Sequence, residues 1–148
     1  MDQQFHILPI SKSSYQDLIE IWEASVRATH HFLPEEDIQY FKPLILDQYF
    51  DAVELTGICN AEQKIVGFSG VAEKMIEMLF IHPDYFRKGL GKKLVELAIK
   101  EKGINAVDVN EQNPQAVKFY QKMGFEIKSR SPLDGLGKPY PILHLELK

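Results

Sequence analysis

The sequence predicts an α+β (mixed α/β) fold. Segments with apolar residues at the helical period of 3.6 are interspersed with extended runs that read as strands. Two neighbouring extended runs are joined by a short hairpin connection, whereas a later pair is separated by a helix, so hairpins and one strand-helix-strand crossover are combined. At 148 residues the chain has the usual size of one domain, and we expect a single domain over residues 1–148.

The N-terminal half begins with a short strand at Phe5–Ile10 and an amphipathic helix that Ser13 or Ser14 can cap. A second helix is expected from Pro34 to about Phe50, because proline and the acidic residues after it suit a first helical turn. The apolar face of the first helix consists of Leu18, Ile21, Trp22, Ser25 and Val26.

The remaining chain alternates strands and helices. Glycines end both expected helices, at Gly103 and Gly124. The expected strands are Val53–Cys59, Ile65–Ala72, Met75–Ile81, Ile104–Val109, Phe125–Ser129 and Ile142–Leu147, and the helices are Gly89–Lys102 and the segment that Asn113 and Pro114 open.

Composition excludes several classes of protein. The formal net charge is −4 and no dense cluster of Lys and Arg is present, so nucleic acid is not an expected partner. No apolar run reaches the roughly 18 residues of a membrane span. A lone Cys59 and an N-terminus, Met1–Gln4, without signal-peptide character favour the cytoplasm.

A basic, glycine-bearing turn at residues 86–92 lies between an expected strand and an expected helix. The first turn of a helix has N–H groups without partners, and glycine lets a phosphate approach the backbone closely. The turn is therefore a candidate anion cradle. It is not a Walker A loop, which would need Gly at Phe86 and Ser or Thr at Lys93, nor a dinucleotide fingerprint, which would need Gly at Leu94.

Two spaced motifs resemble the GNAT acetyltransferase superfamily. Residues 86–91, Phe-Arg-Lys-Gly-Leu-Gly, are similar to its acyl-CoA loop, although Phe86 replaces the usual Gln or Arg. Residues 113–125 are similar to its N-x-x-A-x-x-F-Y-x-x-x-G-F element. The resemblance extends over the whole order of elements, and it implies a mixed, mostly antiparallel sheet flanked by helices.

The resemblance implies that acetyl-CoA is the acetyl donor. It implies that Tyr120 protonates the departing thiolate, whereas the helical pattern alone would make Tyr120 a core aromatic. Asn113 is by position a helix N-cap, to which the resemblance adds a contact with pantetheine or ordered water. The residues expected to bind the donor are Leu79, Ile81, Arg87, Lys88, Gly89, Leu90, Gly91, Lys92 and Asn113.

An amine acceptor must lose a proton before it attacks the thioester. Glu77 is the expected base, on the same side of a regular strand as Met75, Leu79 and Ile81, and a solvated strand charge is the alternative. The position that the family uses is occupied here by Met75. Glu73, His82 and a water molecule are the other candidate bases.

The acceptor is expected between the first two helices and the loop at residues 134–140. We expect the acceptor to be the amine of a small molecule. Protein lysine or N-terminal acetylation is the alternative, and a non-catalytic acyl-CoA sensor is an alternative of another class. No metal is expected, and the protein is expected to be a monomer or a homodimer. For Trp22 a core position is the alternative, because this residue lies on the apolar stripe of its helix. The residues expected to contact the acceptor are Trp22, Thr29, His30, Phe32 and Asn110.

Overall fold

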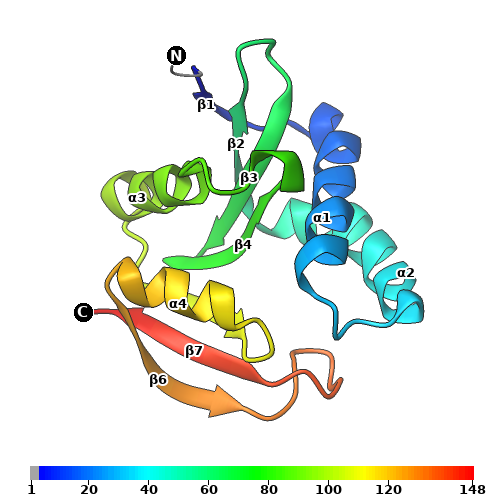
Figure 1. Cartoon of the computed structure of the whole chain (residues 1–148), viewed down its shortest axis with the longest axis vertical. Helices are drawn as coiled ribbons and strands as arrows, with labels where there is room; N and C mark the ends of the chain where they lie inside the picture. Colours follow the sequence, from blue (N-terminus) through cyan, green and yellow to red (C-terminus); the bar gives the residue numbers. More distant parts are fainter. Residues whose placement is uncertain (1–3) are drawn as a thin grey trace.

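The computed structural model describes residues 4–148 and contains a seven-stranded sheet in the order β1-β2-β3-β4-β5-β7-β6 (Figure 1). Residues 1–3, part of the N-terminal stretch discussed above, lie outside the described range. All neighbouring strands are antiparallel except β4 and β5. The predicted class is confirmed. The strands are β1 (His6–Pro9), β2 (Glu54–Cys59), β3 (Ile65–Ala72), β4 (Met75–Ile81), β5 (Ala106–Asn110), β6 (Phe125–Ser131) and β7 (Ile142–Leu147).

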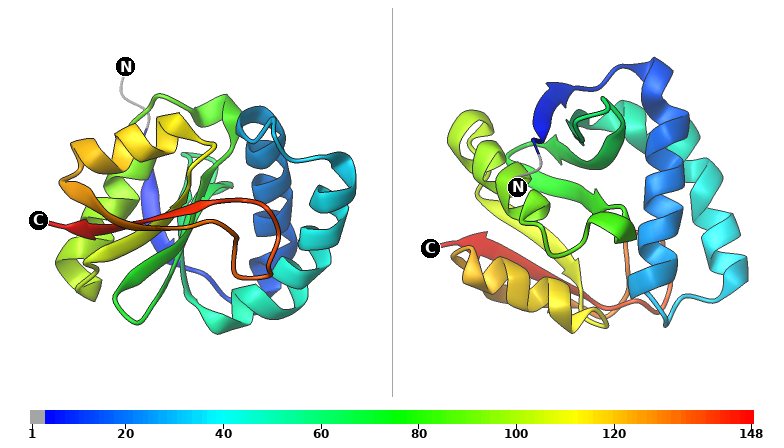
Figure 2. Two further views of the ribbon diagram at one scale, coloured as in Figure 1. Left: turned by 90° about the horizontal axis from the view of Figure 1, so that it is seen from below. Right: turned by 45° about the horizontal axis from the view of Figure 1, so that its top comes forward.

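Helices cover both faces of the sheet (Figure 2). Helices α1 (Tyr15–Thr29) and α2 (Glu35–Leu44) pack on one face of β2–β4, around Phe50 and Phe68. Helices α3 (Leu90–Lys102) and α4 (Pro114–Lys122) pack on the other face, α3 against β2–β4 and α4 against β5 and β6. Within the described residues, none of the helices has the length and apolarity needed to cross a membrane.

Two local expectations for the first helices need correction. Ser14 precedes α1, but its side chain makes no capping bond, because a 3₁₀ turn at Lys12–Ser14 runs into the helix and Lys12 O accepts from Tyr15 N–H. The second helix does reach residue 50, but it is not regular. Pro43 lies inside α2 and lacks an N–H group, and the chain then adopts a π turn at Ile45–Tyr49 and a 3₁₀ turn at Phe50–Ala52.

Strand β4 is not regular either, which corrects the expected placement of Glu77. The pairing with β3 changes from Gly70↔Met78 to Val71↔Ile76, so Glu77 is the extra residue of a β-bulge. The bulge interrupts the alternation that would place Glu77 beside Leu79. Beyond it, Met78 packs toward α1 and α2, and Leu79 toward α3 and α4.

Strands β4 and β5 then separate. Their parallel pairing consists of Met75↔Ala106 and Ile76↔Val107 only. From Glu77 onward, no strand within residues 4–148 pairs with the edge of β4 that faces β5, and the sheet opens into a V (Figure 1). Backbone N–H and C=O groups along this edge are therefore available to a ligand.

A set of contacts, here called the clasp, joins α2 to the loop between β6 and β7. Asp37 accepts hydrogen bonds from the Tyr140 hydroxyl and from Lys138 Nζ, the latter at 3.3 Å. Lys138 Nζ also lies 4.5 Å from the ring centre of Tyr40, and the Phe32 ring lies 5.8 Å from that of Tyr140. The clasp holds two segments together that are about a hundred residues apart in sequence.

We predict that Asp37→Ala destabilises the protein in a pH-dependent manner. Hydrogen bonding from Tyr140, followed by the Lys138 contacts, lowers the pKa of Asp37 below 3.8. Its contribution should therefore be complete above that pH and disappear as the pH falls through the lower folded-state pKa. Urea unfolding of the parent and of Asp37→Ala should differ at pH 7 and converge in strong acid. An equal difference at both pH values would contradict the assignment.

Candidate active site

The turn between β4 and α3 has the conformation of an anion cradle. Arg87 and Gly89 both adopt left-handed backbone conformations, with φ of 64° and 77°. The first helical hydrogen bond runs from Lys93 N–H to Gly89 O, at 3.1 Å, so the preceding N–H groups of α3 have no helical acceptor. A side chain other than glycine is strained at such a φ, so Arg87 keeps a strained backbone conformation directly before the N-terminus of α3.

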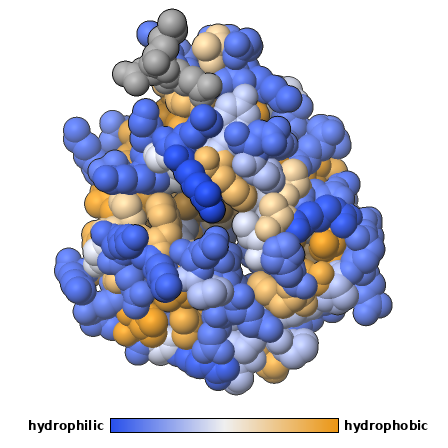
Figure 3. Space-filling model, in the orientation of Figure 1, coloured by the Kyte–Doolittle hydropathy of each residue, from blue (hydrophilic) through white to orange (hydrophobic). Residues whose placement is uncertain are grey.

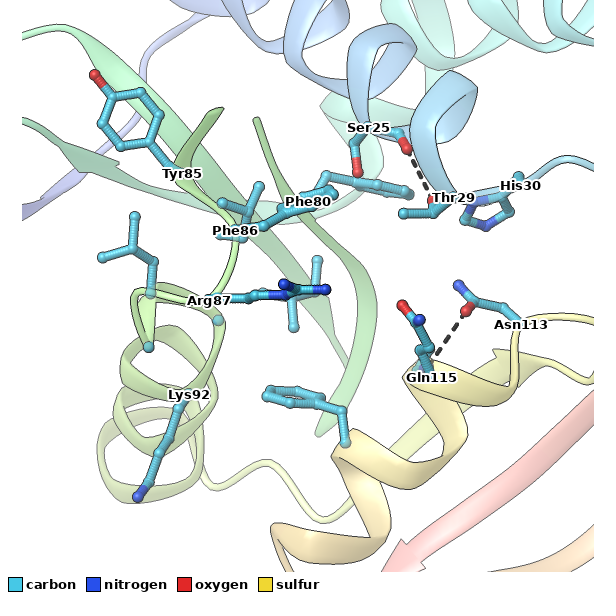
Figure 4. Close-up of a pocket in the computed structure, with 17 residues that line it drawn as sticks. Ser25, Thr29, His30, Phe80, Tyr85, Phe86, Arg87, Lys92, Asn113 and Gln115 are labelled. Atoms are coloured by element: carbon cyan, nitrogen blue, oxygen red, sulfur yellow. Dashed lines mark hydrogen bonds between the residues drawn. The ribbon is translucent and has the colours of Figure 1, made fainter. Parts of the chain in front are cut away.

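A cleft of about 440 Å³ opens in front of this turn. We call it the main cleft. It lies between the N-terminus of α3, strand β4, the start of α4 and the end of α1 (Figure 4). The space-filling view shows a hollow on this face, with apolar side chains inside and hydrophilic ones around it (Figure 3). The structure brings these predicted residues to its wall: Thr29, His30, Leu79, Ile81, Arg87, Gly89, Leu90, Gly91, Lys92 and Asn113.

The charged side chains of the turn differ in their directions. Arg87 extends across the main cleft toward α4, whereas Lys92 points away from it (Figure 4). Lys88, also predicted to bind the donor, is exposed and does not line the main cleft. The backbone and Arg87 therefore provide most of the positive potential inside the cleft.

Several residues of the main cleft were not found by sequence reasoning. They are mostly aromatic or aliphatic, and on their own such residues are indistinguishable from core positions. Phe119 belongs to the motif at residues 113–125, and this motif could have indicated that Phe119 lies at the site. The residues missed are Ser25, Phe80, Tyr85, Phe86, Gln115, Ala116 and Phe119.

A second, smaller cavity of about 110 Å³ lies where β4 and β5 separate. We call it the splay cavity. Three of the predicted residues line it together: Glu77, the expected base, Asn110, an expected acceptor contact, and Tyr120, the expected acid. Asp108, which was not predicted, lines the same cavity. The two cavities are contiguous, because they share His30, Leu79, Phe80, Asn113 and Ala116.

Tyr120 is both a core residue and a site residue. Its ring packs edge-on against Phe119 and Phe125, with centres 5.0 and 5.7 Å away, and the residue is 6% exposed. Burial raises the pKa of Tyr120 far above its usual value of 10.0. The hydroxyl therefore keeps its proton throughout the neutral and mildly alkaline range.

Glu77 is exposed at the edge of the splay cavity. Its pKa is raised above 4.5, first by loss of solvent around the carboxyl group and then by the negative charges of Asp108 and Glu73. A raised pKa makes this carboxylate a stronger base than an ordinary glutamate. Asn113, as predicted, caps α4, with Oδ1 accepting from Ala116 N–H at 3.3 Å.

His30 is held in one tautomer. The Thr29 hydroxyl donates to Ser25 O at 2.8 Å, so the 2.7 Å contact between Thr29 Oγ1 and His30 Nδ1 requires the proton to be on Nδ1. Burial, helped by the neighbouring His31, lowers the pKa of His30 to about 4. His30 is therefore neutral at pH 7 and presents Nε2 as an acceptor.

Some predicted residues are not brought to either cavity. Trp22 is 5% exposed and belongs to the core between α1, α2 and the sheet. It therefore packs inside the protein, as its position on the apolar stripe of α1 allows, and does not line the acceptor site. Phe32 contacts His30 and Tyr140 instead of lining a cavity. His82, an alternative base, lines a different cavity beside Asp84, where its Nδ1 accepts from the Asp84 N–H.

Comparison with known proteins identifies the family to which a chain with this fold and site belongs. Residues 53–127 match the family described as acetyltransferase (GNAT) domain. Together with the close relatives below, this match shows that the chain belongs to the GNAT family and is an acetyl-CoA-dependent N-acetyltransferase.

The chain is 39% identical over 142 residues to the peptidyl-lysine N-acetyltransferase YjaB of Salmonella typhimurium, an alignment that covers 94% of this chain and 97% of that protein. It is 38% identical to YjaB of Escherichia coli, covering 94% and 96%. The solution structure of apo YjaB from Escherichia coli has a TM-score of 0.87 at 37% identity, with 97% of each chain covered. The PaiA N-acetyltransferase of Thermoplasma acidophilum, solved in complex with coenzyme A, shares the fold, with a TM-score of 0.73 at 23% identity and coverage of 97% and 99%.

We predict that Gly91→Glu abolishes acetyl-CoA binding, whereas Gly91→Ala does not. A Cβ atom at residue 91 would lie 3.5 Å from Phe119 Cζ and 3.8 Å from Leu79 Cδ2, which is ordinary contact. A glutamate there would bring a negative charge into the main cleft, and affinity measured by calorimetry should fall at least about 100-fold.

Gly91→Gln is the matched control, because it adds the same bulk without the charge. Both variants should keep the parent's unfolding midpoint. Parent-like affinity of Gly91→Glu would show that the pyrophosphate does not bind at this turn.

Proposed function

We propose that this protein transfers the acetyl group of acetyl-CoA to the side-chain amine of protein lysines. The observation that carries the proposal is the pair of contiguous cavities, one suited to a phosphate-bearing donor and the other to the tip of an alkylamine. The names of the YjaB relatives favour lysine acceptors over the small-molecule amine that the sequence led us to expect.

The proposed donor site is the main cleft. The N–H groups at the start of α3 and the guanidinium of Arg87 would meet the pyrophosphate, because both provide positive potential there. The open edge of β4 would pair with the amide groups of pantetheine in the way that a neighbouring strand would. This placement would bring the thioester to the splay cavity, beside Tyr120.

The proposed chemistry is direct transfer between two bound substrates. Glu77 removes a proton from the acceptor ammonium, the free amine attacks the thioester carbonyl, and N–H groups on the open edge of β4 polarise that carbonyl. The C–S bond breaks and Tyr120 protonates the sulfur. Ammonium and thioester thus give amide, thiol and one released proton.

The raised pKa of Tyr120 is compatible with this role. A thiolate formed beside the buried hydroxyl has also left water, so the same loss of solvation raises the pKa of the thiol. The difference in pKa between Tyr120 and the thiol is therefore smaller than the upward shift in the pKa of Tyr120 alone, and the proton transfer is easier by that amount.

The dimensions of the splay cavity favour a slender acceptor. Its volume of about 110 Å³ accommodates the end of an alkyl chain and not an entire aromatic or sugar-like acceptor. A lysine side chain can reach such a cavity while the protein that bears it stays outside.

Mass spectrometry on a panel of lysine peptides and of small amines, each with acetyl-CoA, tests the proposed function. Acetylated lysine is expected, with turnover exceeding that of the small amines. Turnover of the small amines alone would restore the small-molecule interpretation.

We predict that Tyr120→Phe lowers kcat by about 10² to 10³, the range of a positioned general acid. The substitution keeps the ring, so the core packing and the affinity for acetyl-CoA should not change. Tyr40→Phe, which removes a hydroxyl from an exposed position on α2, is the control and should leave kcat unchanged. Unaltered turnover of Tyr120→Phe would leave Tyr120 with a packing role only.

We predict that Glu77→Gln loses most activity at low pH. The parent should lose kcat/KM as the pH falls through the raised pKa of Glu77, so its acid limb should lie above pH 4.5. Without the base, the reaction depends on free amine, which increases toward the lysine pKa of about 10.4. The deficit of Glu77→Gln should therefore shrink with increasing pH. Superimposable pH profiles would exclude Glu77 as the base.

A further inference from the structure

A chain of hydrogen bonds crosses the three C-terminal strands beside the splay cavity. Ser131 Oγ on β6 lies 2.7 Å from His144 Nε2 on β7, and His144 Nδ1 lies 2.7 Å from Asp108 Oδ1 on β5. The sheet itself sets this arrangement, because Asp108 and His144 are directly opposite in the β5–β7 register. Side chains on such a pair point to the same face of the sheet.

The direction of one of these bonds is fixed by chemistry. An ionised carboxylate can only accept, so His144 Nδ1 carries the proton that lies between it and Asp108. The bond occupies Asp108 Oδ1 and leaves Oδ2 for another donor. The order Ser-His-Asp resembles that of serine hydrolases, but Ser131 and His144 line neither the main cleft nor the splay cavity, so this chain of hydrogen bonds lies outside the proposed donor and acceptor sites.

Asp108, in contrast, lines the splay cavity together with Glu77 and Asn110. It is close enough to Glu77 to raise the pKa of that carboxyl group. Asn110 Oδ1 is enclosed and has no hydrogen-bond partner within residues 4–148. A buried oxygen without a partner destabilises the folded protein, and a hydrogen bond from a ligand N–H group would remove this destabilisation. Three residues of β4 and β5 whose side chains carry oxygen acceptors thus line one small cavity.

We infer that Asp108 is the second carboxylate of the acceptor site and binds the acceptor as a primary alkylammonium ion, with His144 and Ser131 as its positioning residues. An alkylammonium group has three N–H donors, and Glu77, Asp108 and Asn110 Oδ1 provide three acceptors. Glu77, at the bulge, takes the proton, and Asp108 keeps the nitrogen in place. The inference rests on the proposed function and specifies its substrate class as cationic amines.

The test compares two acceptors that differ in charge. One is a lysine peptide that the parent acetylates, and the other is the same peptide with an alkyl side chain of similar length that ends in an aminooxy group, which is equally slender but neutral at pH 7.5. For Asp108→Asn we expect the KM of the lysine peptide to increase about tenfold, the scale of a lost charge-assisted contact. The KM values of the aminooxy peptide and of acetyl-CoA should change less than about twofold.

A pair of His144 variants tests the positioning role. The side-chain amide of His144→Asn can replace Nδ1–H as a donor to Asp108, so this variant should keep most of the parent's affinity for the lysine peptide. His144→Leu cannot donate and should behave like Asp108→Asn. A merely structural role would instead lower the unfolding temperature of both variants and affect both acceptors alike.

The inference is overturned if Asp108→Asn affects the two acceptors equally, or if it affects neither. If His144→Leu fails to fold, the isosteric Asp108→Asn variant still tests whether Asp108 binds the acceptor. If the parent acetylates no lysine peptide, the proposed function fails, and the comparison is made with a small alkylamine and a small O-alkyl hydroxylamine, which is neutral at pH 7.5. A parent that accepts only neutral amines would refute both.

Discussion

The short pairing between β4 and β5 is the constraint on which the rest of the site depends. Two residue pairs hold the strands together, and the bulge at Glu77 follows at once. A longer parallel ladder would satisfy the backbone of β4 internally and close the sheet. Because the ladder stops, β4 has an edge inside the molecule, where an unpaired strand is protected from other chains and accessible to a ligand.

The same opening explains why the donor and acceptor halves of the site meet. Helix α3 follows β4 and α4 follows β5, so the N-termini of the two helices lie on either side of the main cleft (Figure 4). The glycine-bearing turn at residues 86–92 lies on the α3 side, and Tyr120 belongs to α4. Separation of the two strands thus leaves the main cleft and the splay cavity side by side, with lining residues in common.

Most of the fold could be predicted from the sequence, because each element has a local cause. The period of apolar residues along α1 and the glycine that ends α3 are visible in the chain itself. The bulge at Glu77 was not predictable in this way, since it reflects the pairing of β4 with β3 and has no marker within β4. For Trp22 the sequence left acceptor contact and core packing both open, because a helix stripe does not say how deeply each of its members is buried, and the structure places this residue in the core.

The candidate site likewise has one half that leaves a local marker in the sequence and one half that depends on how strands pair. The proposed donor half consists mainly of backbone N–H groups, whose geometry depends on glycine and on helix position, and therefore it leaves a local motif at residues 86–91. The proposed acceptor half consists of side chains that β4, β5 and β7 contribute singly, so Asp108 and His144 have no spacing in common that a motif could record. Proteins of one fold can therefore hold the same donor in the same way while single substitutions on separate strands change the acceptor. In this chain, the residues that we propose for the acceptor half besides Glu77 are Asp108 and its hydrogen-bonded partner His144, which are directly opposite in the β5–β7 register.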